Sequence, residues 1–227
     1  MEGLGVKISL PSIRAQSFMG TRGANIVKRA GLTFAPEAGS DRLRRKLDKQ
    51  MTNEEIIKKS ELAFKAGWKK IKLYFMIGLP GETYDDLDAI IKLASEIGDV
   101  SLSISPFIPK PHSDLERDGM EDLGALKDKR SYLYSRLEAA GRKRQNIKID
   151  FHDLEMSKIE AILSRGDRRV GEVIKRVWQK GGRLQAWNEY FRYNLWMDSF
   201  EEADIDQEYY LKKRVKDIMP WSFIDMD

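Results

Sequence analysis

Two apolar segments, each followed at once by a polar loop containing glycine, constrain what this chain can fold into. Residues 32–36 (LTFAP) lead into Glu37-Ala-Gly39-Ser40, and residues 71–77 (IKLYFMI) lead into Gly78-Leu-Pro-Gly-Glu-Thr83. Nearly continuous apolar runs of this length are typical of parallel strands that are covered on both faces. Ligands in such α/β units bind at the carboxyl ends of the strands. We therefore expect any chemistry at Glu37–Ser40 and Gly78–Thr83.

The segments around these two loops continue the same alternation. Strands are predicted at residues 5–10, 32–37, 70–77 and 100–107, and helices at residues 17–29, 41–47, 52–66 and 83–97. Thr52-Asn-Glu-Glu55 has the spacing of a capping box, and Thr83 to Asp86 is predicted to cap the next helix. The strand at 100–107 alternates apolar and polar residues, so one of its faces is expected to be wetter. A run of βα units predicts the α/β class.

The pattern becomes mainly helical after Pro111, so we expect one region at residues 1–111 and a helical region at residues 112–227. Helices are predicted at residues 122–142, 154–165, 168–180, 184–200 and 206–217, with a short strand at 147–151. Trp187, Tyr190 and Trp196 belong to an aromatic run that also holds Phe191 and Tyr193. At this spacing it is more typical of the buried face of a helix than of a surface on which bases stack.

Composition excludes several classes of protein. The 227 residues are 41% hydrophobic and 33% charged, which is ordinary for a globular protein, and no apolar run approaches the length of a membrane span. No signal peptide opens the sequence, so the cytoplasm is the expected compartment. The absence of cysteine excludes disulfides and thiolate metal sites. A net charge of +4 permits contact with nucleic acid without arguing for it.

The first loop offers the better candidate for ligand binding. The carboxylate of Glu37 can accept hydrogen bonds from a ribose diol or an ammonium group, and Gly39 allows a ligand close to the backbone. The alternative is an acid placed near a helix N-terminus because the helix dipole favours it there. The second loop lacks the Gly-Lys-Ser/Thr ending of a phosphate-binding loop, so an NTPase is not indicated.

Other charged residues have simpler explanations. Arg14 would lie at the mouth formed by the strand ends and suits a carboxylate, although a surface arginine is the commoner case. His112 and His152 lack the spacing of metal ligands, and Asp153, beside His152, is expected to cap a helix rather than to supply acid or base chemistry. The cluster Arg165-Gly-Asp167-Arg-Arg169 could bind an anionic group or pair with nearby acids.

Residues 32–44 (LTFAPEAGSDRLR) and 72–83 (KLYFMIGLPGET) resemble the second half of a radical S-adenosylmethionine (radical SAM) enzyme core. The resemblance is to a branch with a cobalamin-binding-like domain before the barrel. It implies that residues 5–111 form the third to sixth strands of a six-stranded partial (β/α) barrel and that residues 112–227 form the helical region after it. The CxxxCxxC segment that defines the superfamily is absent from this sequence, which contains no cysteine.

The resemblance also implies a cofactor and its binding residues. The cofactor is S-adenosylmethionine, which Glu37 would help to hold. The adenine would lie against the second strand, lined by Tyr74 and Met76 or by Phe75 and Ile77, and near Ser103 and Ser105. The implied cofactor-binding residues are Glu37, Gly39, Ser40, Met76, Gly78 and Ser105.

In the superfamily, an electron from a [4Fe–4S] cluster cleaves S-adenosylmethionine to a radical that abstracts hydrogen from a substrate. Without cysteine, this chain is expected to bind no such cluster unless another segment or chain supplies the thiolates, and it would not be catalytic alone. If residues 5–10 form the third strand, the open edge beside it predicts a missing amino-terminal half, a partner chain or self-association. The alternative function is a non-catalytic binding or assembly module, in contact with RNA through its basic helices.

Overall fold

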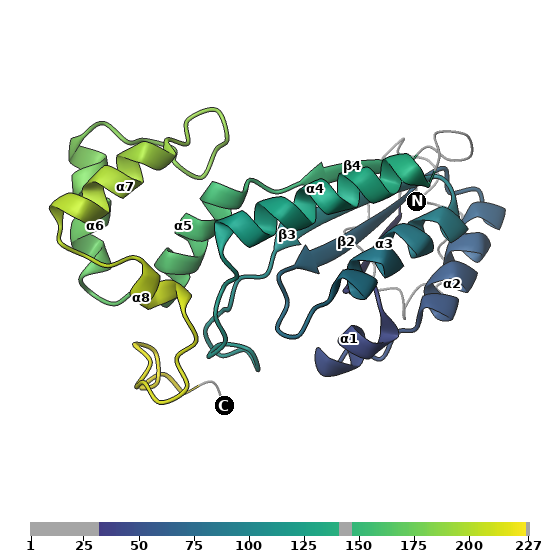
Figure 1. Ribbon diagram of the computed structural model, residues 1–227, viewed down its shortest axis with the longest axis horizontal. Helices are drawn as coiled ribbons and strands as arrows, with labels where there is room; N and C mark the ends of the chain where they lie inside the picture. Colours follow the sequence, from purple (N-terminus) through teal and green to yellow (C-terminus); the bar gives the residue numbers. More distant parts are fainter. Residues whose placement is uncertain (1–31, 141–146, 226–227) are drawn as a thin grey trace, which may run out of the picture. The chain divides into compact units, whose positions relative to one another are not determined.

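The computed structural model describes residues 32–140 and 147–225 of the chain (Figure 1). The strand predicted at 5–10, the helix predicted at 17–29, Arg14 and the end of the helix predicted to reach residue 142 lie outside the described residues. The elements are β1 (Leu32–Glu37), α1 (Asp41–Lys46), α2 (Asn53–Lys65), β2 (Ile71–Ile77), α3 (Tyr84–Ile97), β3 (Val100–Pro106), α4 (Leu123–Ala139), β4 (Lys148–Phe151), α5 (Leu154–Arg165), α6 (Val170–Gln179), α7 (Tyr193–Glu202) and α8 (Glu208–Leu211).

The four strands form one parallel sheet in the order β1-β2-β3-β4. Leu32 pairs with Ile71 at the start of the first strand pair, and Ser101 pairs with Lys148 in the last. Because consecutive parallel strands are joined by right-handed crossovers, the connecting helices lie on one face of the sheet. Figure 1 shows α2 and α3 along that face. The predicted α/β class is confirmed, and the sheet is consistent with part of a TIM-like barrel.

Local sequence explains where the connecting helices begin and end. Thr52 caps α2, since its hydroxyl accepts a hydrogen bond from the Glu55 amide at 3.2 Å and the Glu55 carboxylate accepts one from the Thr52 amide at 3.1 Å. The predicted capping box is therefore confirmed. The chain leaves α2 through Gly67, which has a φ of 92° that few other residues adopt.

The burial of β2 alternates along the strand. Ile71, Leu73, Phe75 and Ile77 are fully buried, whereas Lys72 and Met76 are half-buried and Tyr74 is exposed. The expectation that both faces of the strands are covered is therefore met on one face only. On the more open face, Nζ of Lys72 lies 4.7 Å from the ring centroid of Tyr74, and the apolar parts of both side chains contribute to the apolar character of the strand. Ser101, Ser103 and Ser105 of β3 are also half-buried, as the predicted wetter face requires.

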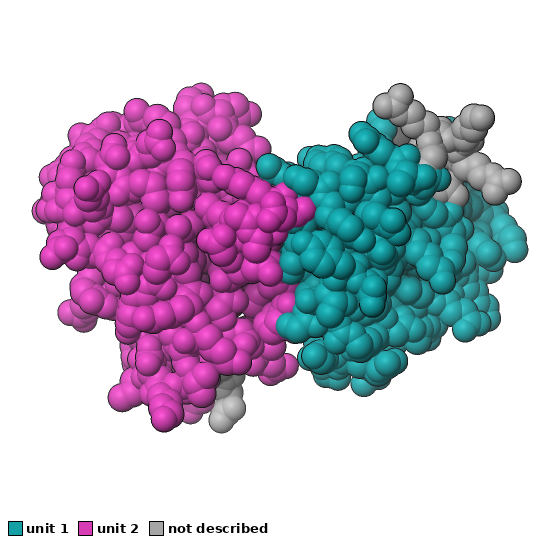
Figure 2. Space-filling model, viewed as in Figure 1, with its two compact units in different colours: residues 1–77, 81–104, 129–151 teal, residues 78–80, 105–128, 152–227 magenta. Residues whose placement is uncertain are grey.

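The chain divides into two compact units (Figure 2). Unit 1 comprises residues 1–77, 81–104 and 129–151, and it contains most of the sheet with α1, α2 and α3. Unit 2 comprises residues 78–80, 105–128 and 152–227, and it contains α5 to α8. None of the helices in the described ranges is both long enough and apolar enough to cross a membrane.

The predicted helix at residues 184–200 is wrong in its first half, since α7 begins only at Tyr193. Gln185 explains this difference. Its amide group donates to the carbonyl of Tyr190 at 2.6 Å, and its carbonyl accepts from the Arg192 amide at 3.1 Å and the Trp196 indole at 3.2 Å. Because one side chain satisfies these groups, residues 184–192 form turns instead of a helix.

The predicted final helix at residues 206–217 is also wrong in length, because α8 ends at Leu211. Beyond that residue the chain bonds to Arg117. The Arg214 amide donates to the Arg117 carbonyl at 2.8 Å, and the Arg117 guanidinium donates to the carbonyls of Val215 and Asp217. Tertiary hydrogen bonds thus replace the helical ones, which sequence periodicity does not reveal.

Gly39 shows why the loop after β1 contains glycine. A Cβ at this position would lie 2.2 Å from the carbonyl oxygen of Asp86 and 2.7 Å from the amide nitrogen of Ile90. Both of these are backbone atoms in the first turns of α3, which cannot move away without disturbing the helix. The close packing of the loop on α3 therefore requires the missing side chain.

Gly39→Ala is accordingly expected to lower the free energy of unfolding by about 1–3 kcal/mol, the usual cost of overpacking. Urea unfolding followed by circular dichroism measures it. Gly171→Ala in α6 is the matched control, since a Cβ there meets nothing within 4 Å apart from its chain neighbours and the backbone of its own helix, and alanine favours the helix. Equal effects of the two substitutions would contradict the packing argument.

Candidate functional site

The loop at the carboxyl end of β1 begins at a residue in an unusual backbone conformation. Glu37 has a φ of 68°, in the left-handed region that residues other than glycine seldom adopt. The pairing of β1 with β2 is also irregular just before it, between Phe34 and Glu37. The Glu37 side chain remains 24% exposed, with its carboxylate 3.4 Å from Lys49 Nζ. Strained residues held at strand ends are often functional, which makes Glu37 the first candidate.

Arg44, in α1, forms hydrogen bonds that fix this loop. Its side chain is fully buried, and its guanidinium donates to the carbonyl of Ala38 at 2.6 Å and to that of Met51 at 2.7 Å. The same group also bonds to the side chains of Asp41 and Asn53. Burial lowers the pKa of Arg44, and the Asp41 carboxylate offsets part of that effect. The guanidinium stays charged and fixes the carbonyl that follows Glu37.

Asp86, in the first turn of α3, joins this loop to the one after β2. Its carboxylate accepts hydrogen bonds from the Ser40 hydroxyl on the first loop and from the Arg42 guanidinium in the first turn of α1. On the second loop it accepts from the Thr83 amide at 2.8 Å and the Thr83 hydroxyl at 2.9 Å. Asp86 is only 3% exposed, so these partners replace nearly all of its hydration.

Two further contacts support the same junction. The hydroxyl of Ser40 also accepts a hydrogen bond from the Leu43 amide at 3.1 Å, which caps the start of α1. The guanidinium of Arg42 also donates to the carbonyl of Gly81 at 3.0 Å. The Asp86 carboxylate therefore joins the first loop to Thr83, and Arg42 joins the start of α1 to Gly81 of the second loop.

The electrostatics of Asp86 follow from these contacts. Burial on its own would raise the pKa of the Asp86 carboxyl. The hydrogen bonds from Ser40, Thr83 and Arg42 together outweigh burial and hold the pKa of Asp86 below its ordinary value. The charged form of Asp86 is thus the form that the folded loops stabilise.

The structure gives structural roles to two of the predicted binding residues. Gly39 is needed for packing against α3, and Ser40 is engaged in the α1 cap and with Asp86. Neither observation tests whether these residues also bind a ligand. Glu37 differs from both, because among the described residues its carboxylate pairs with a single cation, the exposed Lys49.

The remaining predicted binding residues lie in β2, directly after it, and in β3. Met76 is half-buried on the more open face of β2, and Ser105 is half-buried on β3. Gly78 has a φ of 77°, and a Cβ there would lie 2.9 Å from a methyl group of Leu126 and 3.0 Å from the Glu121 carboxylate. The turn and its packing account for this glycine. A cofactor-binding role for these three residues stays a prediction.

Sequence reasoning missed the long-range part of this junction. Thr83 and Asp86 are recognisable as the start of a helix from their spacing, but the bonds from Ser40 and Arg42 cross more than 40 residues of sequence. Arg44 gave no signal, because a buried arginine in Arg-Leu-Arg-Arg reads as part of a solvated helix. Only the fold places these cations beside the carbonyls and carboxylates that they satisfy.

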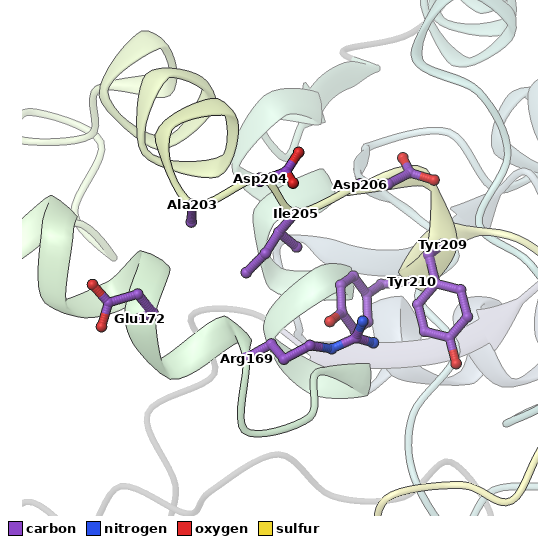
Figure 3. Close-up of a pocket in the computed structure, with 8 residues that line it drawn as sticks. All are labelled: Arg169, Glu172, Ala203, Asp204, Ile205, Asp206, Tyr209 and Tyr210. Carbon is purple, nitrogen blue, oxygen red and sulfur yellow. The ribbon is translucent and has the colours of Figure 1, made fainter.

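The second candidate region is a pocket in unit 2 with a volume of about 480 Å³ (Figure 3). Its lining residues are Arg169, Glu172, Ala203, Asp204, Ile205, Asp206, Tyr209 and Tyr210. The Arg169 guanidinium lies 5.4 Å from the ring centroid of Tyr209 and 5.8 Å from that of Tyr210. Arg169 also forms an ion pair at 2.7 Å with Asp167, an acid of the same cluster, so this one arginine follows the second of the two alternatives.

The aromatic run does not form one buried face as expected. Trp196 is buried in α7, but Trp187 is 60% exposed and Tyr190 is 53% exposed, because they lie on the turns around Gln185. Trp178 of α6 is likewise exposed, with the Arg183 guanidinium 4.6 Å from its ring centroid. Unit 2 thus carries exposed aromatic side chains and an exposed arginine.

Residues suited to metal binding are not grouped together. The described ranges contain no group of three or more histidine, aspartate or glutamate side chains that could hold a metal ion. Nδ1 of His152 lies 3.0 Å from the Ser157 hydroxyl. Asp153 accepts a hydrogen bond from the Met156 amide at 2.8 Å, which confirms its predicted role as a helix cap.

Comparison with known proteins finds a superfamily model that matches part of this chain. The sequence model of the radical SAM superfamily matches residues 5–94, which include both strand-end loops and Asp86. An uncharacterised protein of Methanocaldococcus jannaschii is 36% identical over 178 residues. That alignment covers 77% of this chain and 38% of the archaeal protein, so the chain spans well under half of this relative.

Replacement of the junction carboxylate gives a test of its strength. Asp86→Asn is expected to lower the free energy of unfolding at pH 7 by about 1.5–3 kcal/mol, the usual worth of hydrogen bonds to a charged group. Since the pKa of Asp86 is lowered in the folded protein, this stabilisation is complete above the unfolded pKa of about 3.9. It is lost as the pH falls through the lower folded pKa.

Urea unfolding of both proteins between pH 7 and pH 3 measures this dependence. The difference between wild type and Asp86→Asn should be constant from pH 7 to pH 5 and should shrink below about pH 4. Asp85→Asn is the control, because that neighbouring carboxylate is exposed and is expected to change stability by less than about 0.5 kcal/mol. A difference that grows as the pH falls would contradict the assignment.

Proposed function

We propose that this chain contributes the carboxyl-terminal strands of a radical SAM-type barrel and part of an S-adenosylmethionine pocket. The observation that carries the proposal is Glu37, a partly exposed carboxylate in a strained conformation at a strand end, within the part of the chain that matches the radical SAM superfamily. Such a carboxylate can accept hydrogen bonds from a ribose diol or from an ammonium group. The substrate of the complete system is not specified by these residues.

The surroundings of Glu37 support a binding role over a purely structural one. The loop after it is held by Arg44 and Asp86, so the carboxylate is carried on a rigid support. Its ion pair with Lys49 is 3.4 Å long, and the Lys49 side chain is 46% exposed. Exposed pairs of this kind are worth little, so a ligand that donates to Glu37 can displace Lys49 at small cost.

The residues of this chain do not fit the superfamily's iron–sulfur cluster. Cluster iron is normally held by thiolates, and the sequence has no cysteine. We therefore assign no cluster-dependent step to this chain. In our proposal, another segment or another chain supplies the thiolates, and this chain supplies Glu37 and the walls around the cofactor.

A second candidate function, a non-catalytic binding module, is favoured by one observation. Trp187, Tyr190 and Trp178 are exposed in unit 2, with Arg183 against the last of them. Exposed aromatic and arginine side chains can stack on unpaired bases. An RNA affinity that falls steeply with salt would support this candidate, whereas saturable binding of S-adenosylmethionine supports the first.

The role of Glu37 gives the test of the proposed pocket. Titration calorimetry of S-adenosylmethionine into the wild type is expected to show weak, saturable binding, because ribose and adenine contacts would act without the cluster. Glu37→Ala should weaken that affinity by about 10- to 100-fold, the equivalent of a hydrogen bond to a charged group.

Glu54→Ala is the matched control, since Glu54 is an exposed glutamate in the first turn of α2. This substitution should leave the affinity unchanged. Equal affinities of the wild type and Glu37→Ala would remove Glu37 from the pocket, and an absence of saturable binding by the wild type would contradict the proposal for this chain.

A further inference from the structure

Two buried arginines in unit 2 have hydrogen-bond donors for which the described residues supply no acceptor. Arg165, at the end of α5, is fully buried, and Arg214, in the segment after α8, is 3% exposed. Within residues 32–140 and 147–225, no acceptor reaches Nε or Nη2 of Arg165, or Nη1 of Arg214. Burying a charged donor without a partner is costly, so each of these atoms calls for an acceptor.

The open atoms of Arg165 have the geometry of a recognition site. Nε–H and Nη2–H lie on the same edge of the planar guanidinium and point in parallel, and this edge binds the two oxygens of a carboxylate or phosphate together. The remaining nitrogen, Nη1, makes only a long hydrogen bond of 3.5 Å to the Leu211 carbonyl. The edge that an oxyanion would bind is therefore buried and has no acceptor among the described residues.

Arg214 is held by two of its three guanidinium nitrogens, and Nη1 has no acceptor among the described residues. Its Nε donates to the Asp217 carboxylate at 2.8 Å, and its Nη2 donates to the Tyr209 hydroxyl at 3.1 Å. Both arginines therefore contact α8, Arg165 at the Leu211 carbonyl and Arg214 at the Tyr209 hydroxyl. Burial lowers the pKa of Arg165, and the like charge of Arg214 lowers it further. Two neighbouring buried cations repel each other unless an anion lies with them.

Carboxylates near the pair do not fill this role, because each already has a partner. Asp118 pairs with Lys213 at 2.9 Å, Asp217 with Arg214, and Glu116 accepts from the Trp221 indole at 2.7 Å. Their charges raise the pKa of Arg165, but burial and the charge of Arg214 together lower it by more. With Arg117, which pairs with Glu116, the residues named here comprise four cations and three carboxylates, so their summed charge is positive.

We propose that Arg165 and Arg214 form a binding site for a small oxyanion, in which the anion bridges the Nε–Nη2 edge of Arg165 and Nη1 of Arg214. The ligand carries a phosphate or carboxylate group, since both present two oxygens to one edge of a guanidinium. Tyr209 connects the site to the pocket in Figure 3, because its ring lines the pocket and its hydroxyl accepts from Arg214. The site lies wholly in unit 2 and is independent of the proposed function of Glu37.

Thermal unfolding of the whole chain tests the site, because a ligand that binds only the folded state raises the temperature of the unfolding midpoint. Wild type, Arg165→Met and Arg168→Met are compared in sodium chloride, sodium phosphate and sodium acetate at equal ionic strength and pH 7. Arg168 is the matched control, as an exposed arginine in the same cluster. General salt effects on stability act on all three proteins alike.

The wild type and Arg168→Met should unfold roughly 5 °C or more higher with a bound oxyanion at 100 times its Kd than in chloride. Arg165→Met should lose this response while remaining at least as stable in chloride, because it removes an uncompensated buried charge. A response to phosphate alone, or to acetate as well, identifies the oxyanion class. If Arg165→Met does not fold, Arg165→Lys replaces it, since lysine keeps the charge without the paired donors. Equal responses in the wild type and the Arg165 variant would overturn the proposal.

Discussion

The carboxylate of Asp86 is the interaction on which the strand-end region of unit 1 depends. It is almost completely buried, and its partners come from two loops that are far apart in the sequence. Because a buried carboxylate is stable only when its acceptor positions are satisfied, the two loops hold each other in place through it. Arg44 fixes the first loop from the other side, and the missing side chain of Gly39 lets that loop approach α3. Glu37 is thus presented on a support that cannot easily move.

The sequence predicted this region well where the signals were local. The strand after Gly31, the capping box at Thr52 and the helix start at Thr83 all depend on residues within a few positions of one another, and all are confirmed. The link from Ser40 to Asp86 could not be predicted, since nothing in either loop shows which distant side chain it meets. The same limit applied in unit 2. Gln185 and Arg117 take over backbone hydrogen bonds there, and the predicted helices are shorter as a result.

The two units raise different functional questions. In unit 1, the match to the radical SAM superfamily and the partly exposed carboxylate of Glu37 support a cofactor-binding role, but the sequence lacks the cysteines that cluster chemistry requires. In unit 2, the buried guanidinium groups of Arg165 and Arg214 have more donors than the fold satisfies. The sequence alone showed the arginine cluster but could not show which of its members are buried. Arg169 pairs with Asp167 at the surface, whereas Arg165 is enclosed.

Hydrogen exchange of individual amides, measured by NMR in the wild type and in Asp86→Ala, tests the central role of Asp86 most directly. The Thr83 amide donates to Asp86, and the Leu43 amide donates to Ser40, which is itself held by Asp86. We expect both amides to exchange much faster in the variant while the amides of β2, such as that of Leu73, keep their protection. Unchanged protection at Thr83 and Leu43 would show that the two loops are held independently of Asp86 and would contradict this account.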